Sequence, residues 1–358
     1  SNNDNNFAYY KSEYHKKNIE FNRFVIDRLQ KLIINSNYKV MFYSPLKAYS
    51  LMEEFPELSH HLISINEKMI LNILNDKIHT RIWMKNHITT PNSITLHGNE
   101  CTYEYLTKIF NCDEFVIQER FSAGGLGTHL LTKENKNIIS KMLSNKEYLI
   151  SKYIEHSASV NLHIFITKEN VIVFPGSIQL IDYRNNQYIY SGADFCAYKY
   201  IDENYKNKLY LQSKKIGNIL KELGYLGICG IDYLISNDNV YFVELNPRFQ
   251  ASTILLNLEL SNRKLPSIHQ MQFDVLKPYT LNEIKTLEEL DINYSFYKYG
   301  NNLYQDIDMY NYQMTLLENT NETYQILYDG YDRQNIFDNK YLFSVIFNGN
   351  ISSFVSDN

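Results

Sequence analysis

Cysteine is scarce in this sequence, which has four cysteines among 358 residues. Cys101, Cys112, Cys196 and Cys229 form no C-x-x-C pair, the spacing that is typical of structural zinc sites. So few cysteines also exclude the dense disulfide framework of small secreted domains. We therefore expect four free thiols in a reducing compartment.

The chain also lacks long apolar runs and an excess of positive charge. No apolar stretch approaches the roughly 20 residues that cross a bilayer, and residues 1–17 are polar, without the apolar core of a signal peptide. Lysine and arginine are dispersed and the formal net charge is -5, which indicates neither a nucleic-acid surface nor a basic membrane anchor. We expect a cytoplasmic protein that binds neither nucleic acid nor membrane, and a homodimer stays open.

The most informative stretch of the chain, residues 224–252, reads as a β-hairpin. Two runs rich in Ile, Tyr, Val and Phe, 230–236 and 240–246, flank a polar turn at 237–239. A three-residue loop would pair Ser236 with Val240, Leu234 with Phe242 and Asp232 with Glu244. Because side chains alternate along a strand, the two acids would then share one face of the hairpin.

Two opposed acids need a counter charge, since like charges facing each other destabilise a sheet. Asn246 lies two residues beyond Glu244, and its partner Gly230 has no side chain, which leaves room for a ligand. Pro247 ends the ladder, and Arg248 follows where the strand leaves the sheet. Two carboxylates, an amide and a guanidinium suit Mg²⁺ that carries phosphate. The alternative is an edge hairpin whose acids point at water.

A glycine-rich loop lies between two strand-like runs in residues 114–131. The loop reads Ser-Ala-Gly-Gly-Leu-Gly-Thr over residues 122–128. Glycines allow positive φ angles and let several backbone N–H groups approach one phosphate. The Walker loop and the dinucleotide fingerprint both open a helix, which this loop does not. A simple turn is the alternative.

Upstream of the loop, the apolar spacing predicts one helix over Glu67–Trp83, and this helix contains Asp76 and Lys77. A helical lysine is usually solvated. A nucleotide-binding role for Lys77 therefore depends on a family resemblance.

The order of these pieces resembles the ATP-grasp superfamily over about residues 71–252. Asp-Lys on a helix, the glycine loop after a strand, the strand Ile-Ser-Lys-Tyr-Ile and the hairpin Gly-Ile-Asp…Phe-Val-Glu-Leu-Asn-Pro-Arg carry the resemblance, and the hairpin is its most specific part. The resemblance implies an α/β (α+β) chain with an ATP-grasp fold. Its four parts would be an N-terminal Rossmann-like pre-ATP-grasp domain (1–90), a small lid subdomain (91–155), a large subdomain with the Mg-binding hairpin (156–260) and a C-terminal extension (261–358).

The resemblance also implies ATP and Mg²⁺ as cofactors and a role for each matching residue. Lys77 would reach the nucleotide phosphates, and Arg248 would steady the acyl-phosphate or the substrate carboxylate, so both would be catalytic. The magnesium ligands would be Asp232, Glu244 and Asn246. The nucleotide would also contact the loop residues Gly124, Gly125, Gly127 and Thr128 and the hinge residues Lys152, Tyr153 and Ile154.

Three positions depart from the family's pattern. Gln118 stands where many members carry a second phosphate-binding lysine, which removes one positive charge from the nucleotide site. Ser151 replaces a frequent Glu or Gln that contacts the adenine amino group. Glu155 could substitute for the acid that often binds the ribose, so Gln118 and Glu155 stay among the expected nucleotide contacts.

The function that the resemblance implies is an ATP- and Mg-dependent ligase. It would activate a small-molecule carboxylate as an acyl-phosphate and join it to an amine, such as an amino acid, a peptide or a related metabolite. Phosphoryl transfer of this kind needs chiefly positioning and charge neutralisation. Two alternatives stay open: a biotin-carboxylase-like carboxylase, and an ATP-binding pseudoenzyme or regulatory subunit.

Overall fold

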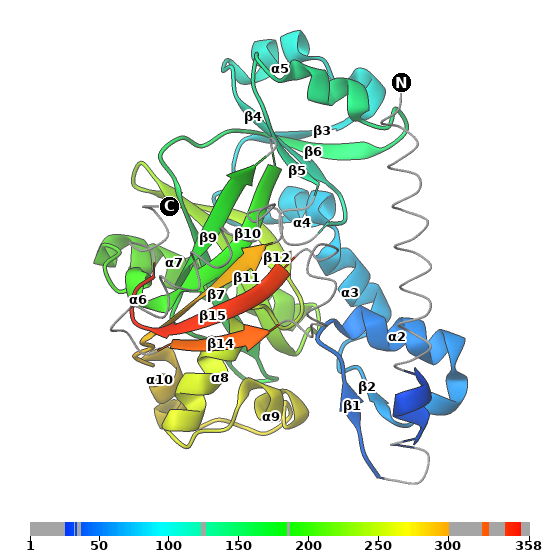
Figure 1. Ribbon diagram of the computed structural model, residues 1–358, viewed down its shortest axis with the longest axis vertical. Coiled ribbons are helices and arrows are strands. Elements are labelled where there is room, and N and C mark those ends of the chain that lie inside the picture. Colours follow the sequence, from blue (N-terminus) through cyan, green and yellow to red (C-terminus); the bar gives the residue numbers. More distant parts are fainter. Residues whose placement is uncertain are drawn as a thin grey trace. The chain divides into compact units, whose positions relative to one another are not determined.

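The computed structural model describes residues 26–31, 33, 37–122, 127–184, 187–300, 324–328 and 341–351. These residues form helices and a large sheet (Figure 1), which confirms the expected mixed α/β class. The chain divides into two compact units, Ser1–Lys68 and Met69–Asn358. The division into four parts by residue number stays a prediction.

The first unit contains a pair of parallel strands. β1 (Val40–Met41) pairs with β2 (Leu62–Ile63), and between them in sequence come α2 (Pro45–Glu54) and the 3-10 turn η1 (Pro56–Leu58). Apolar side chains bury a small core in this unit, formed by Ile26, Ile33, Leu51, Leu58 and Leu62. A helix between two parallel strands is the usual α/β connection.

The helix predicted over Glu67–Trp83 is in fact two helices, α3 (Lys68–Asn75) and α4 (Lys77–Met84). Asp76 separates them with extended backbone angles, φ -81° and ψ 105°. Its side chain accepts a hydrogen bond from the backbone N of His79 at 3.0 Å and so caps α4. The apolar spacing continues through the break and conceals it in the sequence. Lys77 consequently lies in the first turn of a helix.

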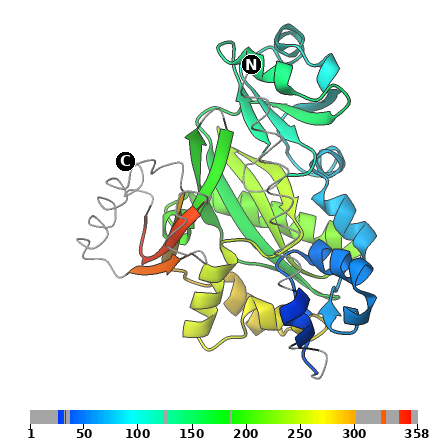
Figure 2. The ribbon, with the colours of Figure 1, turned by 45° about the vertical axis from the view of Figure 1, so that its right-hand side comes forward.

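One sheet of the second unit contains 13 strands of the described residues. Its main path is β12 (Asn239–Asn246), β11 (Gly227–Ser236), β7 (Ala158–Ile166), β9 (Ser177–Arg184), β10 (Gln187–Asp194), β5 (Thr128–Leu131), β4 (Phe115–Glu119), β6 (Glu147–Lys152) and β3 (Ser93–His97). Strands off this path are β8 (Val171–Val173), which pairs with β7, and β13 (Tyr294–Gly300), β15 (Tyr341–Asn348) and β14 (Tyr324–Tyr328). β13 pairs with β10 and β15, so the C-terminal strands, orange and red in Figure 2, join the same sheet.

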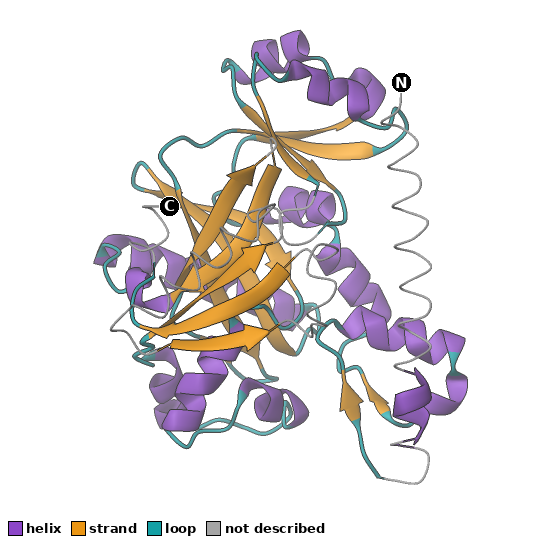
Figure 3. Ribbon diagram, viewed as in Figure 1, coloured by secondary structure: helices purple, strands orange, loops and turns teal. Residues whose placement is uncertain are grey.

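Strands β3 to β6 form an antiparallel part of this sheet, which we call the lid subdomain. α5 (Tyr103–Phe110) covers one face of these strands (Figure 3). The lid also contains the 3-10 turns η2 (Gly98–Glu100) and η3 (Lys136–Lys141). Its buried core consists of Cys101, Tyr103, Leu106, Phe110, Phe115, Ile117, Leu131, Tyr148 and Ile150. The lid strands are therefore fixed by apolar burial of their own.

The long helix α7 (Glu203–Glu222) leads the chain into β11. It lies so close to β8 that a Cβ on Gly217 would be 2.3 Å from Val171 Cγ1. Ser213 on the same face forms a 2.8 Å hydrogen bond with the Tyr233 hydroxyl of β11. The remaining helices are α6 (Phe195–Tyr198), α8 (Thr253–Asn262), α9 (Ile268–Phe273) and α10 (Leu281–Glu288). α7 thus supports the back of the hairpin that carries the two acids.

The loop of that hairpin differs from the prediction. Asn237 and Asp238 both have positive φ angles, 48° and 61°, so they form a two-residue turn of the kind that matches strand twist. Ser236 pairs with Asn239 and Leu234 with Tyr241, so the predicted pairs Ser236–Val240 and Leu234–Phe242 are wrong. Asparagine and aspartate tolerate left-handed backbone, which allows the tighter turn.

A β-bulge then corrects the register. Tyr233 pairs with Phe242, but the next pair is Asp232 with Glu244, so Val243 is an extra residue on β12. The predicted pairing of Asp232 with Glu244 is confirmed, although the turn is one residue shorter than expected. The turn has one residue fewer than predicted and β12 has one residue more, so the two differences cancel at Asp232 and Glu244.

All four cysteines are free thiols. Within the described ranges, no helix is both long and apolar enough to cross a membrane.

Candidate functional site

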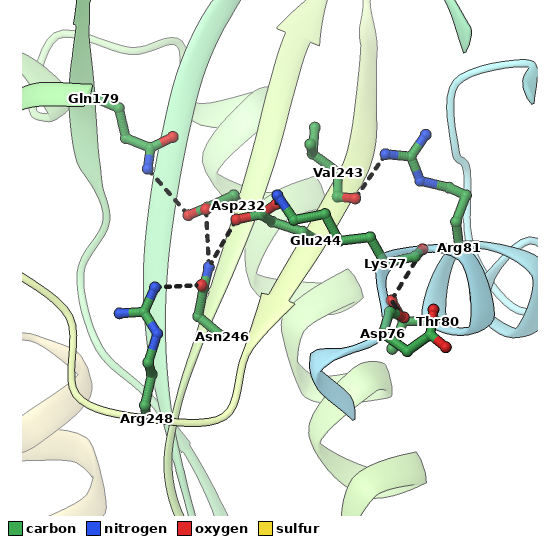
Figure 4. A network of polar contacts seen from close by, with 10 residues as sticks. All are labelled: Asp76, Lys77, Thr80, Arg81, Gln179, Asp232, Val243, Glu244, Asn246 and Arg248. Atoms are coloured by element: carbon green, nitrogen blue, oxygen red, sulfur yellow. Dashed lines mark hydrogen bonds and ion pairs between the residues drawn. The ribbon is translucent and has the colours of Figure 1, made fainter. Parts of the chain in front are cut away.

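The two acids of the hairpin converge on one amide (Figure 4). Asn246 Nδ2 lies 2.9 Å from Asp232 Oδ2 and 3.4 Å from Glu244 Oε1. The other oxygen of Asp232 accepts hydrogen bonds from Asn161 Nδ2 at 2.6 Å and from Gln179 Nε2 at 3.1 Å. β12 is the edge strand, but the Glu244 side chain is only 14% exposed. The alternative in which both acids point at water is therefore wrong.

Lys77 forms an ion pair with one of these acids. Its Nζ lies 2.6 Å from Glu244 Oε2, and the Lys77 side chain is 8% exposed. Lys77 is thus not the solvated helical lysine that was the alternative. α4 brings a positive charge to the face of the hairpin where the acids lie.

The two acids differ in their protonation. Burial, together with the negative charge of Glu244, raises the pKa of Asp232 above its usual range. Burial would also raise the pKa of Glu244, but the Lys77 ammonium and its hydrogen bond outweigh this effect and hold that pKa below the ordinary value. Glu244 is therefore the more readily ionised acid, and a cation shared by both would favour ionisation of Asp232 as well.

Arg248 approaches the acids from the side opposite to Lys77 (Figure 4). Its Nη2 donates to Asn246 Oδ1 at 2.9 Å, and its Nη1 donates to the carbonyl of Phe249 at 3.1 Å. The guanidinium is half-buried. The structure thus brings together five of the expected site residues: Lys77, Asp232, Glu244, Asn246 and Arg248.

The space expected beside Gly230 is not free. A Cβ on Gly230 would lie 1.9 Å from Cδ and Oε1 of Gln250, so the Gln250 side chain occupies the position opposite Asn246. The prediction of room for a ligand at this point is wrong. Glycine is needed here because another side chain packs over it.

The glycine loop is described only at its two ends. Gln118 on β4 is buried and pairs with Thr128, the first residue of β5. Gly127 has φ 70°, and a Cβ there would lie 2.7 Å from Glu119 Cγ, so a side chain at this position would be strained. Gly124 and Gly125 lie outside the described residues. The strand–loop–strand order predicted for this segment is confirmed.

The hinge residues follow β6. Lys152 ends that strand, and Tyr153 and Ile154 come after it, half-buried, before the exposed Glu155. The amides of Lys152 and Tyr153 both donate to carbonyl groups of neighbouring chain segments, at 3.0 and 3.1 Å. The carbonyl of Glu155 accepts a hydrogen bond from Ser236 Oγ at 2.9 Å. Residues 152–155 therefore connect β6 to the acidic hairpin.

Two arginines near the site had no assigned role in the sequence. Arg120 Nη2 lies 2.7 Å from Asp76 Oδ2, and the Arg120 carbonyl accepts the amide of Lys77 at 3.1 Å, which fixes the start of α4 against the end of β4. Arg81 is almost fully buried and donates from Nη2 to the Val243 carbonyl at 2.7 Å. The available signal was the spacing of four residues between Lys77 and Arg81, which places both on one helix face.

The residues present fit Mg²⁺ bound with a nucleotide. One oxygen of each carboxylate points at the Asn246 amide nitrogen, a hydrogen-bond donor that lies where a shared cation would be attracted. In the described part of the chain, no three His, Cys, Asp or Glu residues cluster as metal ligands. A metal here would thus use two carboxylates, the Asn246 amide oxygen after rotation, and phosphate or water oxygens, as Mg²⁺ commonly does.

Comparison with protein families gives a match to the ATP-grasp domain over residues 74–252. The match begins just before Lys77 and ends at Ser252, so it includes the loop, the hinge and the acidic hairpin. No curated protein sequence matches the chain.

Solved structures of several enzymes have a similar fold. The ADP complex of purK, N5-carboxyaminoimidazole ribonucleotide synthetase, superposes with a TM-score of 0.63 at 15% identity and covers 92% of this chain and 80% of its own. Biotin carboxylase of Campylobacter jejuni, in an ATP complex, gives 0.60 at 14% identity, with 89% and 72% covered. The biotin carboxylase domain of Hydrogenobacter thermophilus 2-oxoglutarate carboxylase, with MgADP, gives 0.58 at 13%, with 86% and 68% covered. At these identities the likeness shows the fold.

Proposed function

The chain belongs to the ATP-grasp family of ATP-dependent ligases and carboxylases, and we propose that it activates a carboxylate with ATP and Mg²⁺ and joins it to an amine. The observation that carries this proposal is the cluster around the acidic pair. Lys77 and Arg248 flank the two acids from opposite sides. Lys77 contacts Glu244 directly, and Arg248 donates a hydrogen bond to Asn246, which lies beside both acids.

Bound Mg-ATP would supply the transferable phosphoryl group and the charge that neutralises it. Asp232, Glu244 and Asn246 would bind the metal. Lys77, already 2.6 Å from Glu244, would bind the phosphates that the metal carries. Exchanging an ion pair within the protein for metal and phosphate keeps every buried charge paired.

The substrate side of the proposal rests on Arg248. A guanidinium at the rim of the acidic pair can bind a carboxylate through two parallel N–H donors. The carboxylate would then face the phosphoryl group, and an amine would attack the activated acyl carbon. No protein nucleophile is required, because the phosphate is the leaving group.

The nucleotide base and ribose would bind at the hinge. Lys152, Tyr153 and Ile154 would contact the base, and Glu155, which is exposed, would contact the ribose. Gln118, Thr128 and the glycines of the loop would lie over the phosphates. With Gln118 neutral, Lys77 carries more of the phosphate charge than it would beside a second lysine.

A second candidate is carboxylation, in which bicarbonate takes the place of the carboxylic acid. It is favoured by the names of the similar structures, which are a carboxyaminoimidazole ribonucleotide synthetase and biotin carboxylases. Both reactions would use the same acidic pair and the same positively charged side chains, Lys77 and Arg248.

ADP release separates these functions. The protein would be incubated with ATP, Mg²⁺, and pooled carboxylic acids and amines in bicarbonate-depleted buffer, and products would be identified by mass spectrometry. Amine-dependent ADP release with a new amide is the expected result. Turnover that appears only with bicarbonate would favour carboxylation, and nucleotide binding without turnover in any pool would favour a regulatory protein.

A further inference from the structure

The two acids face each other only because β12 contains one extra residue. The two-residue turn starts a regular ladder, and if that ladder continued, Asp232 would pair with Val243 and Glu244 with Ile231. Side chains alternate along a strand, so Glu244 would then lie on the face opposite to Asp232. The bulge at Val243 returns Glu244 to the face of Asp232. The metal-binding geometry of the proposed function therefore depends on this bulge.

Two contacts from one chain segment stabilise the bulge. Arg81 Nη2 donates to the Val243 carbonyl at 2.7 Å, and the Phe242 amide donates to the Thr89 carbonyl at 2.9 Å. Arg81 lies on α4, and Thr89 follows that helix. A bulge disrupts ladder hydrogen bonds locally, so partners from outside the strand pair stabilise it.

Burial of Arg81 at this position costs free energy. It is 1% exposed, and its Nε and Nη1 have no hydrogen-bond partner among the described residues. A buried, incompletely paired guanidinium costs free energy that an apolar side chain of similar size would not. Packing alone does not explain an arginine here, whereas the hydrogen bond to the Val243 carbonyl and the attraction to the Glu244 carboxylate do.

α4 contacts two adjacent residues of β12, Val243 and Glu244, through two of its side chains. Lys77 forms an ion pair with the Glu244 side chain, and Arg81, one helical turn later, donates to the carbonyl of the residue before it. Figure 4 shows both side chains extending from the helix to adjacent points of the strand. One helix thus fixes both the charge of Glu244 and the backbone that orients it.

We propose that Arg81 is a positioning residue that stabilises the bulge at Val243 and so keeps Glu244 on the face of Asp232, where the two acids can bind Mg²⁺ together. Arg81 touches neither nucleotide nor metal in this role. The inference rests on the proposed function and deepens it, because it names the residue that sets the geometry of the metal site.

The test compares ADP affinity with and without Mg²⁺, measured by calorimetry. The dissociation constant without Mg²⁺ divided by the dissociation constant with Mg²⁺ gives a ratio that reports how strongly the metal site contributes to ADP binding. Arg81→Met should lower this ratio by about 10- to 100-fold, as changes behind a metal ligand commonly do. Metal-free ADP affinity should change by less than about twofold, because Lys77 is retained. Arg81→Lys, which still offers a donor to the Val243 carbonyl, should stay near the wild-type ratio, and so should Arg263→Met, an exposed control.

A deletion distinguishes register from charge. Removing Val243 in the Arg81→Met background joins Phe242 directly to Glu244, so the regular ladder itself would place Glu244 opposite Asp232. The ratio should then recover. A folded double variant with no recovery would overturn the positioning role, since the lost charge and not the register would be the cause.

Three other outcomes also decide the question. If Arg81→Met keeps the wild-type ratio, apolar packing of Ile231 and Leu245 fixes the register and the inference is wrong. If Arg81→Met does not fold, Arg81→Lys decides by the same ratio, and a loss there contradicts the inference. A wild-type ratio near one overturns the metal site and the inference together. Because the assay needs no turnover, a protein that binds Mg-ADP but forms no amide refutes only the proposed function.

Discussion

Lys77 Nζ lies 2.6 Å from Glu244 Oε2, and both side chains are almost fully removed from solvent. The lysine comes from the first turn of α4 and the carboxylate from an edge strand of the sheet. Each charge offsets part of the cost of burying the other. The same pair is where metal and phosphate would enter, so it links the stability of the chain to its proposed chemistry.

Lys77→Met should destabilise the protein by about 3–5 kcal/mol, because it leaves Glu244 buried without its partner. Urea denaturation measures this loss. Lys285→Met, which breaks an exposed pair with Glu289, should cost less than about 0.5 kcal/mol.

The double variant Lys77→Met/Glu244→Gln should be more stable than the two single losses added together. If the stability loss of the double variant equals the sum of the two single losses within error, the two residues do not interact in solution.

Glu244→Gln should lower turnover by about 10²–10³-fold, in the range seen when one charge-stabilising group is removed from an active site. The reason is weaker metal binding, so the variant should also need more Mg²⁺ for half-maximal activity. Glu222→Gln on the exposed end of α7 is the matched control and should behave as wild type. Full activity in Glu244→Gln would contradict the metal assignment.

Gln118→Lys should lower the KM for ATP by about tenfold, because a charged donor to phosphate is worth more than a neutral one. The residue is buried on β4 at the base of the glycine loop. Asn137→Lys adds the same charge to an exposed position of η3 and should leave the KM unchanged. An unchanged KM in Gln118→Lys as well would place residue 118 away from the phosphates.

His163 should make stability depend on pH. It is fully buried on β7, and burial lowers its pKa to about 3. The unfolded chain binds a proton at the ordinary histidine pKa and the folded chain does not, so this contribution is fully present above about pH 6.5 and is lost as pH falls, by about 1.4 kcal/mol per unit. His163→Gln should remove this dependence of the unfolding free energy on pH, measured by urea denaturation at a series of pH values below about 6.5. His79→Gln, at an exposed position of α4, should keep it.

The sequence predicted the pairing of Asp232 with Glu244 only because two differences cancel, since the turn is one residue shorter than expected and the bulge at Val243 adds one residue. It did not predict the turn, since Asn239 resembles Asn237 and Asp238 in polarity and only backbone angles separate loop from strand. The bulge was not visible either. Its hydrogen-bond partner, Arg81, lies far away in the sequence, so the register depends on tertiary contact.

Side-chain packing was equally hidden. Gly230 correctly indicated a position without a side chain, but Gln250 fills the space, and nothing in the order of residues specifies that. The motifs for loop, hinge and hairpin could be found because each has a characteristic local pattern. Asn161 and Gln179, which donate to Asp232, lie on separate strands and have no motif that links them.

Activation of a carboxylate with ATP is the central step of the proposed reaction. The most direct measurement supplies carboxylic acids whose carboxylate oxygens carry a heavy isotope, together with ATP, Mg²⁺ and an amine, and analyses the released phosphate by mass spectrometry. Transfer of the phosphoryl group to the carboxylate predicts that labelled oxygen appears in the phosphate, in step with ADP and amide formation. Unlabelled phosphate, or no ADP release with any acid, would contradict this step.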